Sequence, residues 1–400
     1  MTLSKDRSIT TIEFLILLVL LLTPIFTIQE SLALISLDLR QQINTSNTIT
    51  STYIKALKDL FFIIIILMSF LIIAQSLSVK RDTLRFLGVI LFLILLPAYY
   101  YHTNILVYLS GIRWLLPFIL AAFLFGHIDR NLLQKMGTVM FYIFIAHFLI
   151  QISQFLFSYG YYGLNSFGLS GRNPGIFYVP STAAVFILMV LFFSKFYMKK
   201  SLEKKISYLI PISILLTASG TGVGVYIIFF TVYYLREKYI RFMPVILIFI
   251  GITLLLVLDY FTGRSGLVED SLGARYMHFK EALVHATLLP EYFGYGTATA
   301  ELIRNKFNFG FILPRTDSFY ASLIVNLGLI NFSLIVIGLF ILFVRLTGSH
   351  DKEKLIFFII CSSIALTTSI TESYPMNLIF AVLIAYYLNP KEQNKRLLST

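Results

Sequence analysis

Charged residues are scarce in this sequence, and the scarcity restricts the class of protein. They make up only 13% of the 400 residues, while hydrophobic residues make up 58%. An ordinary soluble domain carries about 25% charged residues. A chain of this length and composition cannot bury its apolar residues in one soluble core, so we expect lipid to be its solvent.

Cysteine and tryptophan are almost absent, with one of each in the chain. The single cysteine, Cys361, lies inside an apolar run. One cysteine forms neither an intrachain disulfide nor a cysteine-ligated metal site, so both are excluded within one chain.

The net charge of +12 raises the question of a nucleic-acid partner. The basic residues form no soluble basic domain and no stripe interleaved with aromatic residues. We therefore expect no nucleic acid as a partner. The basic residues flank apolar segments instead, where membrane lipid of the anionic leaflet is the expected partner.

Apolar segments long enough to cross about 30 Å of hydrocarbon recur along the chain. They predict an all-α, polytopic integral membrane protein with about 12 transmembrane helices in a single membrane domain, residues 1–400. The predicted spans are residues 12–29, 60–78, 85–101, 104–126, 138–158, 181–198, 206–219, 222–236, 242–259, 318–345, 355–371 and 375–389. The two short pairs, 206–219 with 222–236 and 355–371 with 375–389, fit either a hairpin of tilted helices or a re-entrant element.

Lysine and arginine collect in alternate loops between these spans, for example in "KKSLEKK" (199–205) and "REKYIR" (236–241). If the N-terminus is cytoplasmic, about two-thirds of the Lys and Arg residues lie inside, as the positive-inside rule predicts. The alternation holds for every predicted span, so we expect a multi-pass protein with both termini in the cytoplasm. The first apolar run lacks a small-residue cleavage pattern, and we expect it to be retained as a span.

Three predicted extracytoplasmic segments are longer than a turn, namely residues 30–58, 159–180 and 260–317. Long loops without a domain of their own are usually functional or disordered, and aromatic residues argue against disorder. Within the longest loop, "EDSLGARYMHFKEALVHATL" (269–288) predicts a short amphipathic helix. Its apolar face comprises Leu272, Tyr276, Phe279 and Leu283, and its basic face comprises Arg275, His278 and His285. Such a helix also fits an interfacial role, with the basic face on lipid headgroups.

The run "SGTGVG" (219–224) superficially resembles a phosphate-binding loop. It lacks the lysine of that loop and precedes an apolar span. Gly220 and Gly224 are spaced for close helix packing in a membrane, which is the interpretation we favour.

Several short motifs follow one another between about residues 165 and 345. The first two are "GRNPGIFYVPSTAAVF" (171–186) and "LTASGTGVGVYIIFF" (216–230). The strongest part is the ordered set "GARYMHFKEAL", "FGYGTA" (293–298) and "TDSFYASLIVNLGLINFSLIVIGL", the last with an N-x-G-x-I pattern. In this order, and in the longest predicted outside loop, they resemble the O-antigen polymerase and ligase superfamily of bacterial membrane glycosyltransferases.

The resemblance implies a GT-C-like fold in the bacterial inner membrane and a role in lipopolysaccharide, capsule or exopolysaccharide biosynthesis. The implied reaction transfers an undecaprenyl-diphosphate-linked glycan onto a new lipid-linked repeat unit. The donor carries its own leaving group, so no cofactor and no metal is implied. The implied partners are the undecaprenyl-diphosphate-linked oligosaccharide, a polysaccharide chain-length regulator and a flippase.

Two positions separate polymerases from ligases in this superfamily. Ligases, which attach polymer to lipid A core, typically carry an arginine where this chain has Gly220 and Thr221. They also carry a histidine where this chain has Asp317. Both differences favour an O-antigen polymerase (Wzy type), with the ligase as the alternative.

The departing diphosphate needs cationic partners, and arginine binds phosphate bidentately. Arg172 and Arg275 match arginines of the family, while Arg264 and Arg315 lie in the same long loop. Arg113 lies within a predicted span, where it either faces a protein cavity or reaches the outer interface.

The attacking sugar hydroxyl needs a base. Asp317 is the first candidate and His278 the second, and the other acidic candidates are Glu269, Asp270 and Glu372. The alternative role for Asp317 is to cap the helix that begins at residue 318. Gly294 and Gly296 allow the backbone to approach the site closely.

A lipid-linked oligosaccharide flippase or secondary transporter is the alternative from a different class. Such proteins carry polar and charged residues along several helices towards the midplane of the membrane. The predicted spans here are almost free of charge except for Arg113 and His147, and polar residues gather outside. This distribution favours the enzyme.

Overall fold

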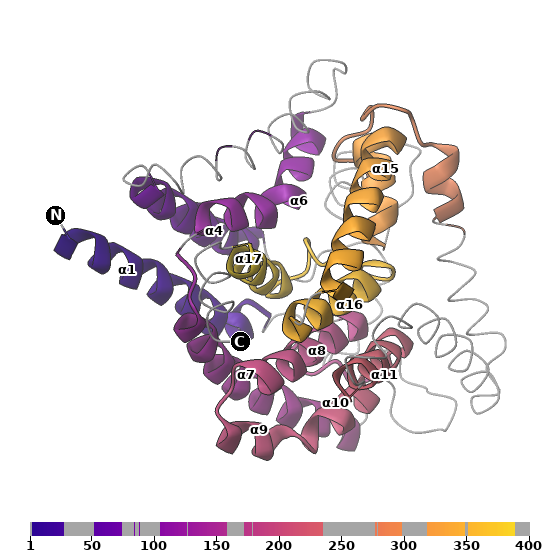
Figure 1. The fold of residues 1–400 in the computed structure, drawn as a ribbon. Coiled ribbons are helices and arrows are strands. Elements are labelled where there is room, and N and C mark those ends of the chain that lie inside the picture. The colour runs from indigo at the N-terminus through magenta and orange to yellow at the C-terminus, as the bar shows by residue number, and fades with distance from the viewer. Residues whose placement is uncertain are drawn as a thin grey trace, which may run out of the picture.

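The computed structural model describes residues 2–27, 52–73, 84, 88, 105–125, 127–157, 172–177, 179–234, 277, 279–297, 318–348 and 351–388. The secondary-structure elements in these ranges are α-helices, as predicted (Figure 1). They are α1 (Thr2–Leu21), α4 (Thr52–Ile73), α6 (Ile105–Leu124), α7 (Arg130–Leu156), α8 (Pro180–Phe196), α9 (Lys200–Ile206), α10 (Leu209–Thr217), α11 (Gly220–Tyr234), α15 (Phe319–Gly348), α16 (Lys352–Ala365) and α17 (Met376–Tyr387).

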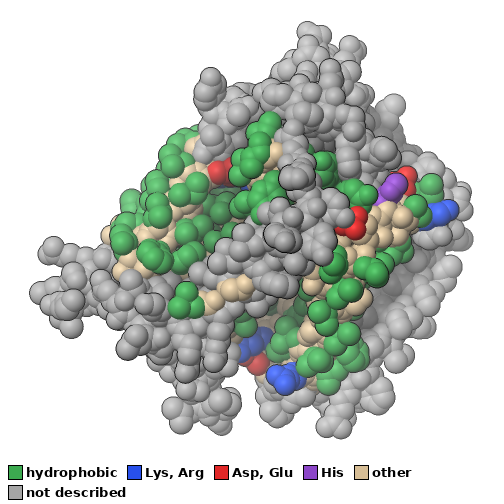
Figure 2. Space-filling view, turned by 90° about the horizontal axis from the view of Figure 1, so that it is seen from above, with side chains coloured by type: hydrophobic (Ala, Val, Ile, Leu, Met, Phe, Trp, Pro, Cys, Tyr) green, Lys and Arg blue, Asp and Glu red, His purple; other side chains and the backbone are tan. Residues whose placement is uncertain are grey.

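Four apolar segments are long enough to cross a membrane, namely Thr10–Thr27, Ile105–Leu124, Arg130–Leu156 and Phe319–Thr347. Three shorter apolar helices are α8, α11 and α17. Hydrophobic side chains also dominate the described surface in the view of Figure 2, with few charged side chains among them. These features are those of a membrane protein. The spans predicted at 85–101 and 242–259 lie outside the described residues, apart from Gly88.

Helix α8 is the most deeply buried helix of the core. Its run from Ala183 to Ser194 is buried on all sides, and it packs against α7, α10, α11, α16 and α17. A helix that is hydrophobic all round is expected to lie inside a bundle. The sequence "AAVFILMVLFFS" has this property, because no face of it carries a charge.

Polar contacts between helices gather at two opposite ends of the bundle. At the predicted outer end, the contacts are Asp59–Arg113, Gln151–Asn173 and Ser318–Ala365. At the predicted inner end, they are Glu13–Lys135, Lys195–Glu203 and Tyr197–Glu353. Each contact joins two residues that are predicted on the same side of the membrane.

The hairpin of α10 and α11 corrects one prediction about glycine. A Cβ added to Gly222 would lie 2.7 Å from Cβ of Ala184 in α8, whereas a Cβ on Gly220 would meet nothing within 4 Å. The prediction of a packing contact is therefore wrong for Gly220. The contact falls at Gly222, because the turn ending in left-handed Ala218 rotates this residue towards α8.

In the predicted amphipathic helix, residues 279–284 are helical. Ala282 is buried and packs with Ala321 and Val325 of α15, with Phe279 beside them. Leu283, also predicted on the apolar face, takes no part in this contact and is 54% exposed. The helix turns its small residue to α15, because Ala321 leaves room for close approach of the two backbones.

Candidate functional site

The N-terminal half of α6 contacts α4, the loop at Gly294 and the start of α15. Ser110 Oγ donates to the carbonyl of Gly294 (3.2 Å), and Arg113 Nε lies 3.0 Å from Asp59 Oδ2 in α4. The rings of Trp114 and Phe319, the first residue of α15, are 5.4 Å apart. We call this group the α6 junction, and it comprises Asp59, Ser110, Arg113, Gly294, Gly296 and Asn326.

The side chain of Asn326 binds the glycine loop, which we define as residues 293–297, to α15. Its Oδ1 accepts hydrogen bonds from the amides of Gly294 (2.7 Å) and Gly296 (3.3 Å). Its Nδ2 donates to the carbonyl of Ser322 (2.7 Å), and Ser322 Oγ donates to the carbonyl of Gly296 (2.8 Å). Asn326 is fully buried. One amide group therefore satisfies two backbone donors that water cannot reach.

The close backbone approach expected of Gly294 and Gly296 is present. Gly294 has a φ of +93°, and a Cβ there would lie 2.1 Å from the carbonyl oxygen of Val107 in α6. A Cβ on Gly296 would lie 2.9 Å from Asn326 Nδ2. Only glycine fits between α6 and α15 at these positions without displacing a helix.

A second contact between the N-x-G-x-I pattern and the long loop lies at Gly328. Gly328 has a φ of +74° and interrupts α15. The amides of Leu329 and Ile330 then donate to the carbonyls of Thr287 (2.9 Å) and Leu288 (3.2 Å). The N-x-G-x-I pattern thus contacts the long loop through its asparagine and again just after its glycine.

Arg113 is paired, and its partner Asp59 was missed by sequence reasoning. The Arg113 side chain is 33% exposed. Lys58 Nζ lies 3.7 Å from the other oxygen of Asp59 and 5.5 Å from the ring centre of Tyr374. A signal existed in the sequence, because Asp59 is the acidic residue directly before the predicted span at residue 60.

Arg172 belongs to a separate centre on α7 and α10. The segment after it, residues 173–177, is bound by one face of α7. Gln154 exchanges two hydrogen bonds with Gly175 (2.7 and 2.9 Å), and Gln151 Nε2 donates to the carbonyl of Asn173 (2.8 Å). Arg172 itself is exposed at the start of this segment. No contact among the described residues joins it to the α6 junction.

His147 of α7 is a further polar residue that contacts the segment 173–177. It is fully buried, and its Nδ1 accepts a hydrogen bond from the amide of Ile176 (3.3 Å). A ring nitrogen that accepts is unprotonated, so the proton resides on Nε2 and the imidazole is neutral. The rings of Phe177 and Phe186 lie 5.6 Å away. The contacts show His147 holding the 173–177 segment in place.

The two candidate bases and three of the arginines lie outside the described residues. These are Asp317, His278, Arg264, Arg275 and Arg315. The residue after Asp317 is informative, because Ser318 directly precedes α15 and its Oγ accepts from the amide of Ala321 (3.4 Å). This is the geometry of an N-cap. Ser318 therefore takes the capping role that was the alternative for Asp317.

Two further acidic candidates, Glu269 and Asp270, also lie outside the described residues. Glu372 is described and half-buried in the segment between α16 and α17. Two residues further on, the hydroxyl of Tyr374 donates to the carbonyl of Val19. Lys58 lies over the ring of this tyrosine. The segment 366–375 follows Ala365, whose carbonyl accepts a hydrogen bond from Ser318 Oγ at the start of α15 (3.1 Å). Near its other end, Tyr374 lies beside Lys58 of α4.

No family model, no curated protein and no solved structure matches this chain. Among the described residues, no group of three or more His, Cys, Asp or Glu side chains is placed to hold a metal ion. The described part of the site thus offers arginine, amide and hydroxyl groups.

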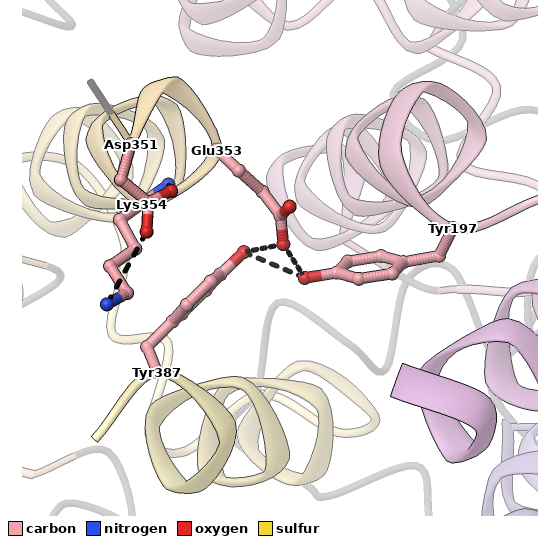
Figure 3. A network of polar contacts seen from close by, with 5 residues as sticks. All are labelled: Tyr197, Asp351, Glu353, Lys354 and Tyr387. Atoms are coloured by element: carbon pink, nitrogen blue, oxygen red, sulfur yellow. Dashed lines mark hydrogen bonds and ion pairs between the residues drawn. The ribbon is translucent and has the colours of Figure 1, made fainter. Parts of the chain in front are cut away.

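A buried polar cluster lies at the opposite end of the bundle. The hydroxyls of Tyr197 and Tyr387 both point to the carboxylate of Glu353 (Figure 3), and the two hydroxyl oxygens are 2.9 Å apart. The cluster ties together the end of α8, the start of α16 and the end of α17.

Proposed function

We propose that this chain is a metal-independent membrane glycosyltransferase that polymerises a polysaccharide, such as O-antigen. It transfers an undecaprenyl-diphosphate-linked glycan onto a new lipid-linked repeat unit at the extracytoplasmic face of the bacterial inner membrane. We further propose about 12 transmembrane helices, both termini in the cytoplasm and a GT-C-like arrangement.

One observation carries the proposal. The glycine loop and the N-x-G-x-I helix resemble two motifs of one superfamily, and they meet in space although Gly294 and Asn326 are 32 residues apart. The shared contact is a pair of hydrogen bonds to one buried side chain. Motifs that matched only by chance would have no reason to bind each other.

Arg113 is the described residue best placed to bind the diphosphate. Asp59 holds its Nε, and the two terminal nitrogens have no other partner among the described residues. Two terminal N–H groups of a fixed guanidinium match two phosphate oxygens. With Lys58 and Asp59 beside it, the group carries one net positive charge. Arg172, Arg264, Arg275 and Arg315 are proposed as further phosphate ligands.

The proposed base is Asp317, with His278 as the alternative. A hydroxyl oxygen of the acceptor sugar attacks the anomeric carbon of the donor glycan and gives its proton to the base. The bond from that carbon to the diphosphate oxygen breaks, and undecaprenyl diphosphate leaves with both electrons of the bond. Ser318 supports this assignment, because it caps α15 and Asp317 is not needed for that purpose.

The direct test is reconstitution of purified protein with lipid-linked repeat units as the sole substrate. We expect a ladder of products that differ by one repeat unit, without added metal or nucleotide sugar. Transfer of a single unit to lipid A core, with no ladder, would instead show a ligase. Transbilayer movement of the substrate without any new glycosidic bond would show a transporter.

In cells, the site is tested by Arg113→Ala, Arg172→Ala, Arg275→Ala and Asp317→Asn, with polymer length read on gels. We expect each to shorten or abolish the ladder, because each removes a phosphate ligand or the base. Full-length ladders from all four variants, at normal expression, would refute the proposed site.

A further inference from the structure

The segment "KKSLEKK" forms a short helix that is firmly seated on the bundle. In α9, Ile206 is fully buried in the main core, and Leu202 packs against that core one turn earlier. The helix contacts α7, α8 and α10, and it lies at the edge of the molecule below α7 and α10 in Figure 1. Its two apolar residues are four positions apart, so its remaining residues face outward.

The outward residues carry an uncompensated positive charge. The single acidic residue of α9, Glu203, is bound by Lys195 of α8 at 2.8 Å. Lys199, Lys200, Lys204 and Lys205 are exposed. Within the described part of the chain, their ammonium groups have no acidic partner. Three of these cations thus lie on the seven residues of α9, and the fourth, Lys199, is its N-cap residue.

Exposed aromatic residues accompany these cations. Tyr208 directly follows α9 and is 80% exposed, and Leu215 of α10 is 67% exposed. The ammonium groups of Lys195 and Lys352 lie 5.8 and 5.5 Å from the ring centre of Tyr233. Aromatic rings beside exposed lysines are typical of the level at which lipid headgroups meet water.

We propose that the lysine cluster of α9, defined as Lys199, Lys200, Lys204 and Lys205, binds the phosphate of an anionic phospholipid headgroup. The lysines supply the charge, and the apolar surface of α10 beside them contacts the acyl chains. Juxtamembrane lysines attract anionic lipid through the surface potential, and the attraction weakens with salt. This inference does not rest on the proposed glycosyltransferase function.

The test uses full-length protein in detergent, titrated with phosphatidylglycerol or with phosphatidylcholine, and bound lipids are counted by native mass spectrometry. We expect the wild type to retain phosphatidylglycerol in preference to phosphatidylcholine. The double variant Lys204→Gln/Lys205→Gln should weaken phosphatidylglycerol binding roughly 25-fold, since each lysine near an anionic surface contributes about five-fold.

A matched control removes two lysines that are already paired. Lys135 is bound to Glu13 and Lys354 to Asp351, so Lys135→Gln/Lys354→Gln changes the net charge equally, but at lysines that already face a carboxylate. We expect it to retain phosphatidylglycerol within about two-fold of the wild type. Equal losses in both double variants would show a general charge effect and overturn the proposal. Equal retention of the two lipids by the wild type would overturn it as well.

Discussion

At the scale of single residues, the candidate site depends on side chains that bind across helices. Asn326 joins two amides of the glycine loop, and Asp59 fixes the guanidinium of Arg113. Neither role is visible in local sequence, because each partner lies in a different helix or loop. Both roles can be tested by substituting the residue and comparing the variant with a control substitution at a nearby residue.

Replacing Asn326 with leucine should destabilise the protein more than any surface substitution. The amides of Gly294 and Gly296 would lose their shared acceptor in a buried place. We expect a loss of about 2–4 kcal/mol, since each unsatisfied buried group costs about 1–3 kcal/mol. Thermal unfolding in detergent measures this loss.

Asn331→Leu is the control for that substitution. Asn331 lies on the same helix and its side chain donates to the carbonyl of Leu327 (3.0 Å), which is partly buried. We expect a change below about 1 kcal/mol, because this carbonyl can accept from the helix. Equal destabilisation by the two variants would show that Asn326 contributes no more than helix packing.

Replacing Asp59 with asparagine should reduce polymer formation, if the proposed function holds. Asparagine still accepts a hydrogen bond from Nε of Arg113, but it no longer balances the guanidinium charge or restrains the side chain as strongly. We expect a loss of about ten-fold in polymerisation rate. Polymer length and rate are measured with lipid-linked repeat units.

Lys58→Gln is the companion variant, because Lys58 contacts the other oxygen of Asp59. It leaves the contact between Asp59 and Arg113 in place, so we expect a smaller loss than in Asp59→Asn. A rate for Asp59→Asn equal to that of the wild type would show that Arg113 needs no carboxylate to position it.

At the scale of elements, two polar clusters hold helices together at opposite ends. The outer contacts join α4, α6 and α15 to the glycine loop. At the inner end, one carboxylate on α16 binds hydroxyls from α8 and α17 (Figure 3). A hydrogen-bonded cluster in a buried place stabilises the arrangement only while its protonation stays intact.

The Glu353 cluster predicts a loss of stability in Tyr197→Phe. The carboxylate of Glu353 loses one of its two hydroxyl donors, and Tyr387 remains as the other. We expect a loss of about 1.5–3 kcal/mol, as for a hydrogen bond to a charged group. Thermal unfolding in detergent measures this loss.

Tyr208→Phe is the control for that substitution, because Tyr208 is 80% exposed. We expect it to unfold at the wild-type temperature. Equal destabilisation by the two variants would contradict the assignment.

At the scale of the whole molecule, the described helices form a bundle around α8. Helices α7, α10, α11, α16 and α17 pack against α8. Composition and span length were sufficient to predict the helical membrane class, because both are sums over long stretches of chain. The absolute direction of the bundle rests on the distribution of lysine and arginine.

Labelling of single cysteines tests that direction. The chain has one cysteine, so Cys361→Ser gives a background without thiols. Val179 and Ser201 flank α8 and are exposed. In intact cells, we expect a membrane-impermeant maleimide to label Val179→Cys and to spare Ser201→Cys. The reverse pattern would invert the predicted orientation of both termini.

The sequence alone determined the class of this protein, its apolar spans and the positions where the backbone comes close. It also brought out Arg113, Arg172, Gly294 and Gly296 by residue type. These are local properties, since hydrophobicity and the freedom of glycine belong to a residue and its neighbours in the chain. They required no knowledge of which helices touch.

Only the tertiary structure decided the partners. It paired Arg113 with Asp59, placed Asn326 on the glycine loop and gave the cap of α15 to Ser318. It also placed the glycine contact with α8 at Gly222 instead of Gly220. The reason is geometric, because helix crossing and rotation determine which side chains meet, and residues far apart in the chain set both.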